Sequence, residues 1–293
     1  MNKKVLLVVV GPTASGKTKL AIELALKYNT EIISADSRQI YKDLIIGTAQ
    51  PTIQEQRLVK HHLINFVDLD ATYSVADYEK DASRILNVLF KEHDVVVMCG
   101  GTGLYINAVC FGIDEIPDIS QEKRDYVSNL YKNNDLKYCV DLLKQHDHEC
   151  EKFLDIKNPH RVLRALEVIL ETKKPIREFY SNNNKKTFFE VIFINIDIEK
   201  EVLFKRIDLR VDEMIKSGLV DEVKQFEKYR NYNSLKTIGY NEIFEYLDNK
   251  ITLNGAIENI KINTKKYVKR QMTWFKKVKQ NNLKNFINYK TIK

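Results

Sequence analysis

Residues 11–18 are the segment of this chain with the plainest chemistry. They read Gly-Pro-Thr-Ala-Ser-Gly-Lys-Thr, which is G-x-x-x-x-G-K-[ST], and they follow the apolar run 5–10. The glycines let successive backbone N–H groups turn inward around a phosphate, Lys17 neutralises its charge, and the Thr18 hydroxyl can hold Mg²⁺. A strand pattern before the motif and a helical pattern at 17–27 after it are the context that it requires. The segment therefore predicts a bound di- or triphosphate without saying which one.

Two further polar turns are expected beside this loop. The apolar run 31–35 ends at Asp36, and the run 94–99 leads into Gly-Gly-Thr-Gly at 100–103, which contains Thr102. Ligands of parallel sheets bind at the carboxyl ends of the strands, so both turns should face the phosphate. A carboxylate there can act as a general base or hold Mg²⁺ through water, and glycines allow a ligand to approach closely. As alternatives, Asp36 could be only a helix N-cap, and a tight turn would explain the glycines but not the threonine.

Arg206 and Arg210 follow the last predicted strand and are four residues apart, so they share one helix face. An arginine that reaches the phosphates would stabilise a departing diphosphate through charge-assisted hydrogen bonds. Spacing alone leaves surface salt bridges as the alternative.

A parallel α/β sheet is the architecture that would bring these turns together. Runs rich in Val and Ile predict strands at 4–10, 31–35, 94–99 and 190–196, and helical patterns lie between them at 17–27, 74–90 and 200–216. Strands that alternate with helices predict a parallel sheet covered on both faces. The expected fold class is α/β, with a P-loop NTPase-like sheet flanked by helices.

Two regions outside this pattern are predicted to be helical. Residues 117–186 are dense in charge, carry no strand pattern, and end in the polar segment 181–186. They predict a helical subdomain inserted into a core made of 1–116 and 187–293. In the C-terminal third, Tyr267 and Trp274 belong to an amphipathic helical pattern.

Composition restricts the class of protein. The 293 residues are 44% hydrophobic and 30% charged, and no apolar stretch approaches the roughly 20 residues of a membrane span. The chain leads straight from Met-Asn-Lys-Lys into the first strand, so we expect a cytoplasmic protein without a cleaved signal or membrane contact. The cysteines lack C-x-x-C or zinc-finger spacing and predict reduced thiols: Cys99, Cys110, Cys139 and Cys150.

The net charge of +7 is unevenly distributed. Residues 261–293 hold 11 Lys or Arg and no acidic residue, whereas the first 260 residues have 36 basic against 40 acidic side chains. Aromatic residues such as Trp274 and Phe275 are interleaved with these cations. Cations bind a nucleic-acid backbone and aromatic side chains stack on unpaired bases, so the combination indicates an RNA or DNA partner. An ordinary amphipathic helix that buries Trp274 and exposes solvated lysines is the alternative.

Six motifs, in order, resemble the tRNA dimethylallyltransferases, also called IPP transferases. They are the loop at 11–18, Asp-Ser-Arg-Gln-Ile-Tyr at 36–41, Gly-Gly-Thr-Gly-Leu-Tyr at 100–105, Asn-Pro-His-Arg-Val-Leu-Arg-Ala-Leu-Glu at 158–167, Ile-Gly-Tyr at 238–240 and Lys-Arg-Gln-Met-Thr-Trp-Phe at 269–275. The resemblance runs from about residue 5 to 277. Departures are Asn65, Asn158 and Asn241, where the family commonly has Asp, Asp, and Lys or Arg.

The resemblance implies an enzyme that transfers the dimethylallyl group from dimethylallyl diphosphate to N6 of the adenine 3′ of a tRNA anticodon, with release of diphosphate. Asp36 would be the general base, and Thr102 and Arg210 would assist the leaving group. Mg²⁺ would be the cofactor, held at Thr18. The donor's diphosphate would lie on Gly11, Pro12, Thr13, Ala14, Ser15, Gly16, Lys17 and Thr18.

The same resemblance implies a set of contacts to the anticodon loop, in which Gln39 reads the flipped base through its amide. The set is Asp36, Ser37, Arg38, Gln39, Thr102, Arg124, His160, Arg161, Val162, Leu163, Arg164, Gly239, Tyr240, Lys269, Arg270, Gln271, Trp274 and Lys276. A monomer of the shorter, bacterial type is expected. The residues taken alone also permit a small-molecule P-loop kinase, a prenyltransferase acting on free adenine nucleotide, or an RNA-binding protein with a relic loop. The basic C-terminal stretch and the intact loop argue against these alternatives.

Overall fold

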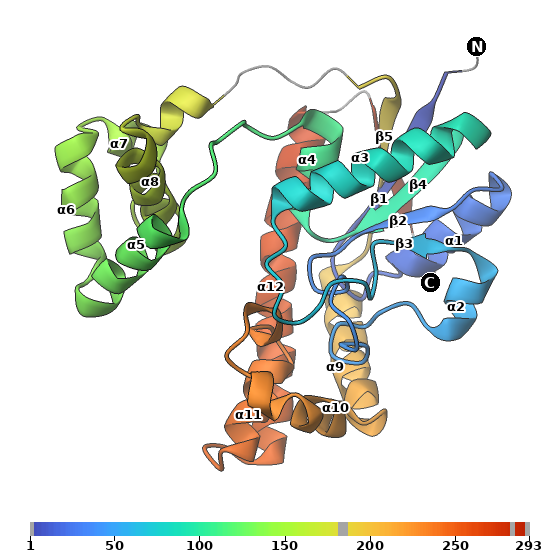
Figure 1. The fold of residues 1–293 in the computed structure, drawn as a ribbon. Coiled ribbons are helices and arrows are strands. Elements are labelled where there is room, and N and C mark those ends of the chain that lie inside the picture. Colours follow the sequence, from blue (N-terminus) through green and yellow to red (C-terminus); the bar gives the residue numbers. More distant parts are fainter. Residues whose placement is uncertain (1–2, 181–186, 282–284, 291–293) are drawn as a thin grey trace. The chain divides into compact units, whose positions relative to one another are not determined.

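A computed structural model describes residues 3–180, 187–281 and 285–290. Figure 1 shows its central sheet, and among these residues six strands lie in the order β3-β2-β4-β1-β5-β6, all parallel. The strands are β1 (Val5–Val10), β2 (Ile32–Ala35), β3 (His61–His62), β4 (Val95–Gly100), β5 (Glu190–Asp197) and β6 (Phe286–Lys290). The predicted parallel sheet and its four main strands are confirmed. The expectation of a purely helical C-terminal third is wrong for β6, which forms because its backbone pairs with β5.

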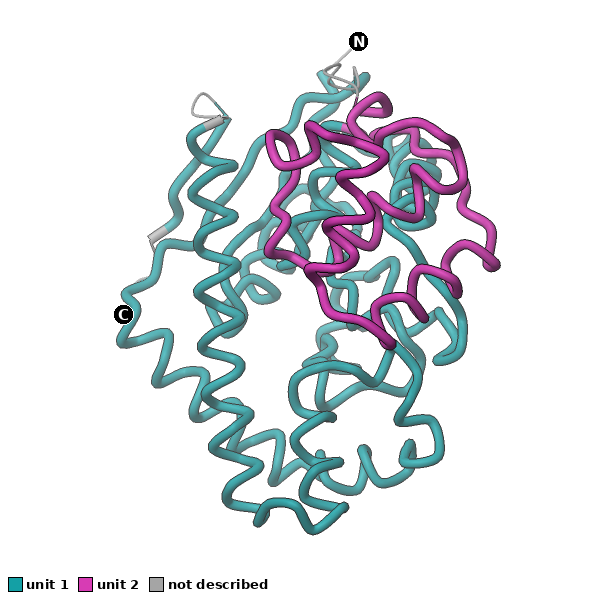
Figure 2. Tube along the Cα trace, turned by 90° about the vertical axis from the view of Figure 1, so that its left-hand side faces the viewer, with its two compact units in different colours: residues 1–111, 186–293 teal, residues 112–185 magenta. Residues whose placement is uncertain are grey.

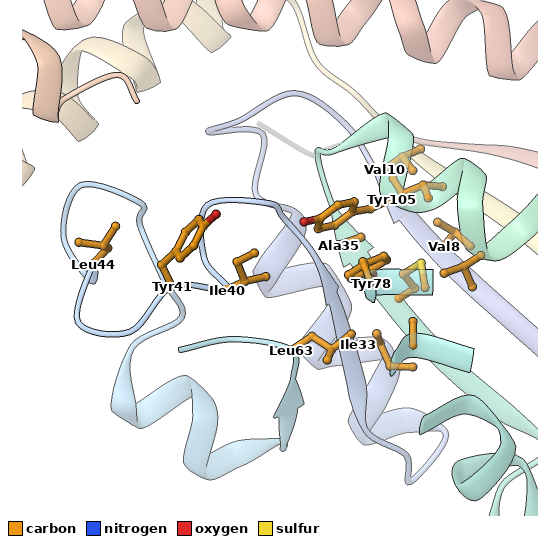
Figure 3. Packing of buried hydrophobic residues seen from close by; sticks show 14 of the residues in the cluster. Val8, Val10, Ile33, Ala35, Ile40, Tyr41, Leu44, Leu63, Tyr78 and Tyr105 are labelled. Atoms are coloured by element: carbon orange, nitrogen blue, oxygen red, sulfur yellow. The ribbon is translucent and has the colours of Figure 1, made fainter. Parts of the chain in front are cut away.

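Alternating apolar residues bury both faces of the sheet. Leu7 and Val9 of β1 pack with α1 (Lys17–Lys27) on one face. Leu6, Val8 and Val10 point to the other face, where they join α3 (Val75–Glu92) and α4 (Gly103–Phe111). Figure 3 shows this second core, with Tyr78 of α3 and Tyr105 of α4 stacked beside Ala35 at the end of β2. Burial on both faces explains why β1 is a continuous apolar run.

Further helices complete the unit that contains the sheet, residues 1–111 and 186–293 (teal in Figure 2). They are α2 (Ile53–Leu58), α9 (Lys200–Lys216), α10 (Leu219–Gln225), α11 (Tyr240–Leu247) and α12 (Leu253–Asn281). Capping boxes begin two of the helices: Thr52 with Glu55 at α2, and Ser74 with Asp77 at α3. Such a cap satisfies backbone N–H groups that the first helical turn leaves unpaired.

Residues 112–185 form a second compact unit (magenta in Figure 2). Its described part is helical: α5 (Gln121–Asn133), α6 (Leu136–His146), α7 (Cys150–Phe153), α8 (Pro159–Thr172) and a 3₁₀ turn (Ile176–Phe179). Val127, Leu143, Val162 and Leu166 lie in its own apolar core. The sequence placed an insertion at 117–186; its closing segment 181–186 is outside the described residues.

Two expectations from composition can be compared with the described residues. None of their helices combines the length and the apolar character that a membrane span needs. The four cysteines carry free thiols, three buried and Cys99 half-buried.

Candidate functional site

The phosphate loop connects β1 to α1 through a backbone that its glycines permit. Gly16 lies at the helix start with φ +96°, a left-handed conformation in which a side chain would be strained. Ala14 also has positive φ, at 62°. Lys17 folds back over the loop and donates from Nζ to the carbonyl oxygen of Pro12 at 2.8 Å. The loop and the N-terminus of α1 therefore surround one place where an anion can bind.

Both predicted arginines of α9 reach this loop. Arg210 Nη1 donates to Thr13 Oγ1 at 3.2 Å, and Arg206 Nη1 lies 3.4 Å from the carbonyl oxygen of Ser15. Their shared face is therefore turned toward the loop rather than engaged in the alternative, a surface salt bridge. Burial lowers the pKa of Arg210, and the negative charge of Asp36 opposes that effect.

Electrostatics at Lys17 favour an anion beside it. Burial and, to a smaller extent, the nearby positive charge of Arg210 lower the pKa of Lys17 to about 8, whereas Cys99 and Asp36 act in the opposite direction. Two cations held together and partly removed from water favour any group that brings negative charge. A diphosphate between them would raise the pKa of the lysine and so stabilise its charged form.

The turns after β2 and β4 are bonded directly to each other, as the sheet rule predicts. Thr102 N–H donates to the Ala35 carbonyl at 3.0 Å, and Thr102 Oγ1 accepts the Ser37 N–H at 2.9 Å. Asp36 Oδ1 accepts the N–H of Arg38 at 2.9 Å, a turn bond. No described helix begins at Asp36, so the N-cap alternative does not apply. Its carboxylate lies close enough to shift the pKa values of Lys17 and Arg210.

The glycines of the second turn let other parts of the protein approach closely, and the approach of a ligand to this turn stays a prediction. A Cβ at Gly100 would overlap the backbone of Ala35. At Gly101 it would overlap the amide of Gln271, and at Gly103 the ring of Trp274. Two of these three close approaches come from α12, so the turn is a docking point for that helix.

Gln271 is a buried bridge between three parts of the fold. Its Oε1 accepts the N–H of Thr13 at 2.9 Å, and its Nε2 donates to the Gly101 carbonyl at 3.1 Å. With 6% of its surface exposed, its side chain holds α12 against the phosphate loop. The contact of Gln271 with tRNA stays a prediction.

Gln39 and Arg38 are half-buried and bonded within the protein. Gln39 Nε2 donates to the carbonyls of Thr48 and Ala49, at 3.2 and 2.9 Å. Arg38 Nη1 donates to the carbonyl of Asn233 at 3.0 Å. An acceptor base would therefore meet an amide whose orientation the following turn has already set.

The Ile-Gly-Tyr motif lies inside the fold. Gly239 has φ +97°, and its N–H donates to Glu242 Oε2 at 2.8 Å. Tyr240 is fully buried and donates its hydroxyl to Glu222 at 2.6 Å. The Tyr240 side chain is therefore packed inside the protein, and the contact of Gly239 and Tyr240 with RNA stays a prediction.

α12 exposes the cations that the sequence assigned to RNA, and these are Lys269, Arg270 and Lys276. Trp274 of the same helix is half-buried against Gly103, so one helix holds both the packed and the charged face that were considered as alternatives.

The predicted contacts of the helical unit differ in exposure. His160 and Arg161 are exposed at the start of α8. Arg164 pairs with Glu167 at 3.2 Å, and Arg124 Nε donates to the Ile119 carbonyl at 3.2 Å. Two apolar members pack into the core of that unit, Val162 fully and Leu163 partly. The RNA contacts of residues 160–164 and Arg124 stay predictions.

The donor set for Mg²⁺ on the protein is small. Thr18 is half-buried in the first turn of α1. Among the described residues no group of three His, Cys, Asp or Glu could by itself hold a metal ion. Mg²⁺ is commonly bound by one or two protein oxygens together with substrate phosphates and water. A threonine hydroxyl beside a diphosphate site fits that mode.

Sequence reasoning missed two residues that shape the site. Glu222 of α10 binds the backbone of residues 45–47, and Gln50 Nε2 donates to the carbonyls of Gln39 and Tyr41. Gln50 precedes a proline and sits in a polar segment, which gives no sign of burial. Glu222 lies in a charged helical stretch, so only the folded chain shows its partners.

Comparisons with known proteins agree with this geometry. The family model for IPP transferase matches residues 39–278. The chain is similar to the tRNA dimethylallyltransferase of Cytophaga hutchinsonii, at 41% identity over 94% of this chain and 90% of that protein. It is also similar to the solved tRNA isopentenylpyrophosphate transferase of Bacillus halodurans, at 34% identity and TM-score 0.68 over 98% of this chain and 90% of that one. A eukaryotic dimethylallyltransferase acting on tRNA gives 27% identity and TM-score 0.84, over 98% and 74%. The chain therefore belongs to the IPP transferase family.

Proposed function

We propose that this chain transfers the dimethylallyl group of dimethylallyl diphosphate to N6 of the adenine 3′ of a tRNA anticodon. The observation that carries the proposal is one charged cluster at the strand ends. Asp36 acts on the pKa values of both Lys17 and Arg210, and Arg210 contacts the phosphate loop at Thr13. A carboxylate that can take a proton thus lies beside cations that can hold a leaving diphosphate.

On the donor side, the loop N–H groups, Lys17 and Arg210 bind the diphosphate. When the allylic C–O bond breaks, the bonding electron pair leaves with the diphosphate, and its negative charge grows. Donors already oriented toward that charge lower the barrier, and each is worth about 10²–10³-fold in rate. Thr18 would hold Mg²⁺, which when bound supplies further neutralisation of the leaving group.

On the acceptor side, the N6 lone pair forms the new C–N bond, and N6 must then lose one proton. Asp36 accepts that proton as general base. Its carboxylate is oriented by the Arg38 N–H, and the turn that carries it is anchored through Ser37 to Thr102. Thr102 thus serves first by fixing this turn, and its hydroxyl faces the same edge of the sheet. The products are the N6-prenylated adenine, diphosphate and a proton.

The exposed cations of α12 give the RNA an electrostatic surface, formed by Lys269, Arg270 and Lys276. An adenine in the anticodon loop is easier to unstack than one in a duplex, so the acceptor can leave its stack and enter the site. We propose that the protein does this in the cytoplasm and as a monomer. Size-exclusion chromatography with light scattering would test the oligomeric state.

Transfer of label tests the reaction. Protein, Mg²⁺ and radiolabelled dimethylallyl diphosphate are incubated with unmodified tRNA or with AMP, and in parallel γ-labelled ATP is offered with shikimate. We expect label only in tRNA, at N6 of one adenosine after nuclease digestion, and none in a tRNA with guanine at that position. Label in AMP would indicate a free-nucleotide prenyltransferase, and phosphorylated shikimate would indicate a kinase.

A further inference from the structure

The turn formed by residues 44–49 is built around a buried carboxylate. Glu222 Oε2 accepts the N–H groups of Ile45 and Ile46 at 3.0 and 2.7 Å. Its Oε1 accepts the Gly47 N–H at 2.9 Å and the Tyr240 hydroxyl at 2.6 Å. Glu222 is 8% exposed. Three successive N–H groups converging on one carboxylate form an anion nest whose anion is supplied by the protein itself.

Tyr240 contacts both the carboxylate of Glu222 and the backbone of this turn. It is fully buried, and a Cβ at Gly47 would overlap its ring, so the phenol packs directly on the turn backbone. Burial and the charge of Glu222 both raise the pKa of Tyr240, which keeps its hydroxyl protonated and donating. The contact between Tyr240 and Gly47 thus fixes the turn sterically, while the hydroxyl completes the carboxylate's set of donors.

The shape of this turn sets the orientation of the Gln39 amide. The carbonyls of Thr48 and Ala49, at the end of the turn, are the acceptors of Gln39 Nε2. Gln50 ties the same segment together from inside, since its Nε2 donates to the carbonyls of Gln39 and Leu44 at 3.1 Å each. Figure 3 shows Ile40, Tyr41 and Leu44 along this loop, which follows the end of β2 at Ala35.

We propose that Glu222 and Tyr240 are positioning residues for recognition of the acceptor adenine, because they hold the turn at 44–49 that orients Gln39. Neither side chain contacts substrate. The inference rests on the proposed function and on the role that the family resemblance implies for Gln39, which is to read the acceptor base through its amide. It gives the buried tyrosine of the Ile-Gly-Tyr motif a role inside the protein.

Two variants separate the charge from the packing. Glu222→Gln keeps the shape of the side chain but removes its charge. Its NH₂ group replaces one carboxylate oxygen and therefore faces N–H groups of the turn. Tyr240→Phe keeps the ring on Gly47 and removes one hydrogen bond. We expect kcat/KM for tRNA to fall by about 10²-fold in the first, since small misplacements cost that much, and about tenfold in the second. Dimethylallyl diphosphate binding should stay within about twofold of the wild type in both, because the phosphate loop is not part of this turn.

Matched controls lie on the same helices. Asp221→Asn alters an exposed carboxylate next to Glu222, and Tyr246→Phe alters a half-buried tyrosine of α11. Both should leave kcat/KM for tRNA unchanged. Hydrogen exchange supplies a readout independent of activity: amides at 45–47 should lose protection in Glu222→Gln and Tyr240→Phe, while those of the phosphate loop keep theirs.

A double-mutant cycle with Gln39→Ala tests whether Glu222 acts on tRNA recognition through Gln39. If Glu222 acts through Gln39, adding Glu222→Gln to Gln39→Ala should cost little more, a non-additive result expected of coupled residues. Additive losses of kcat/KM, or an equal loss of diphosphate binding, would overturn the proposal. If Glu222→Gln does not fold, the same cycle is measured with Tyr240→Phe in its place. A wild-type protein that does not prenylate tRNA would instead refute the proposed function.

Discussion

The two sides of the site are held together in different ways. The phosphate side is eight consecutive residues at 11–18, with Lys17 bonded to Pro12 only five positions away. The acceptor side is the segment 36–50, whose turn is held by Glu222 across 175 to 177 residues of sequence. One side depends on local backbone conformation, and the other depends on tertiary packing. Substitutions should therefore separate donor binding from acceptor recognition.

The phosphate loop also has distant partners, which are Arg206 and Arg210 of α9 and Gln271. Gln271 comes from α12, far along the chain, yet it bonds Thr13 of the phosphate loop and Gly101 of the neighbouring turn. The helix with the exposed cations is thereby attached to the donor side. The proposed RNA surface of α12 and the proposed diphosphate site of the loop therefore share a structural element.

The largest expected effect is at Asp36, where the two sides meet. Asp36→Asn keeps the size of the side chain and an acceptor for the Arg38 N–H, but it removes the base. We expect kcat to fall by about 10²–10⁴-fold, the usual worth of general-base catalysis, with tRNA and donor affinities nearly unchanged. Single-turnover transfer and filter binding would measure both. A rate near that of the wild type would show that another group takes the proton.

The next effect belongs to the phosphate side alone and appears with pH. The pKa of Lys17 is about 8. A bound diphosphate should raise it, because a nearby negative charge favours the protonated lysine. Donor affinity is therefore fully present below pH 8 and is lost as pH rises from 8 toward the pKa of the complex, by up to about tenfold per pH unit. Calorimetric titration with dimethylallyl diphosphate between pH 7 and about 10 would show this fall.

Lys17→Arg is the matched control for that pH dependence. Its guanidinium stays charged throughout this range, so its donor affinity should be flat from pH 8 upward even if it is weaker overall. Affinity for tRNA, measured in the wild-type protein over the same range, should not follow the donor curve. An equal decline for both ligands would point to general unfolding, which circular dichroism at each pH would reveal.

Gln271→Leu should have a smaller effect, which lowers both the stability of the fold and the affinity for the donor. The apolar side chain leaves the Thr13 N–H and the Gly101 carbonyl buried without their partner, at a cost of about 1–3 kcal/mol in the free energy of unfolding. Urea melts would measure that cost. Donor affinity should fall with it, whereas Met272→Leu, a half-buried neighbour, should change neither. Unchanged donor binding in Gln271→Leu would separate α12 from the phosphate loop.

The sequence predicted the parts of the molecule whose signals are local. β1, the loop and α1 were recognised because an apolar run, fixed glycine spacing and helical periodicity occur in one short segment. The contact between the turns that carry Asp36 and Thr102 followed from the sheet rule. The bonds that Gln271 makes inside the protein were not predicted, because a motif shows that a residue type recurs without showing which way its side chain points. β6 and Glu222 were missed since each gains its role only from a partner far away in sequence.

The smallest effect is expected on the exposed face of α12. Lys269→Ala removes one exposed cation that has no part in the proposed chemistry, so kcat at saturating tRNA should not change. Affinity for tRNA should weaken a few-fold, and the slope of log affinity against log salt should become shallower by about 1, since one phosphate contact fewer releases one counterion fewer. Lys91→Ala, an exposed cation at the end of α3, is the control and should leave the slope unchanged. If the slope of Lys269→Ala equals that of the control, the RNA does not lie on this face, and the basic residues of α12 are only solvated.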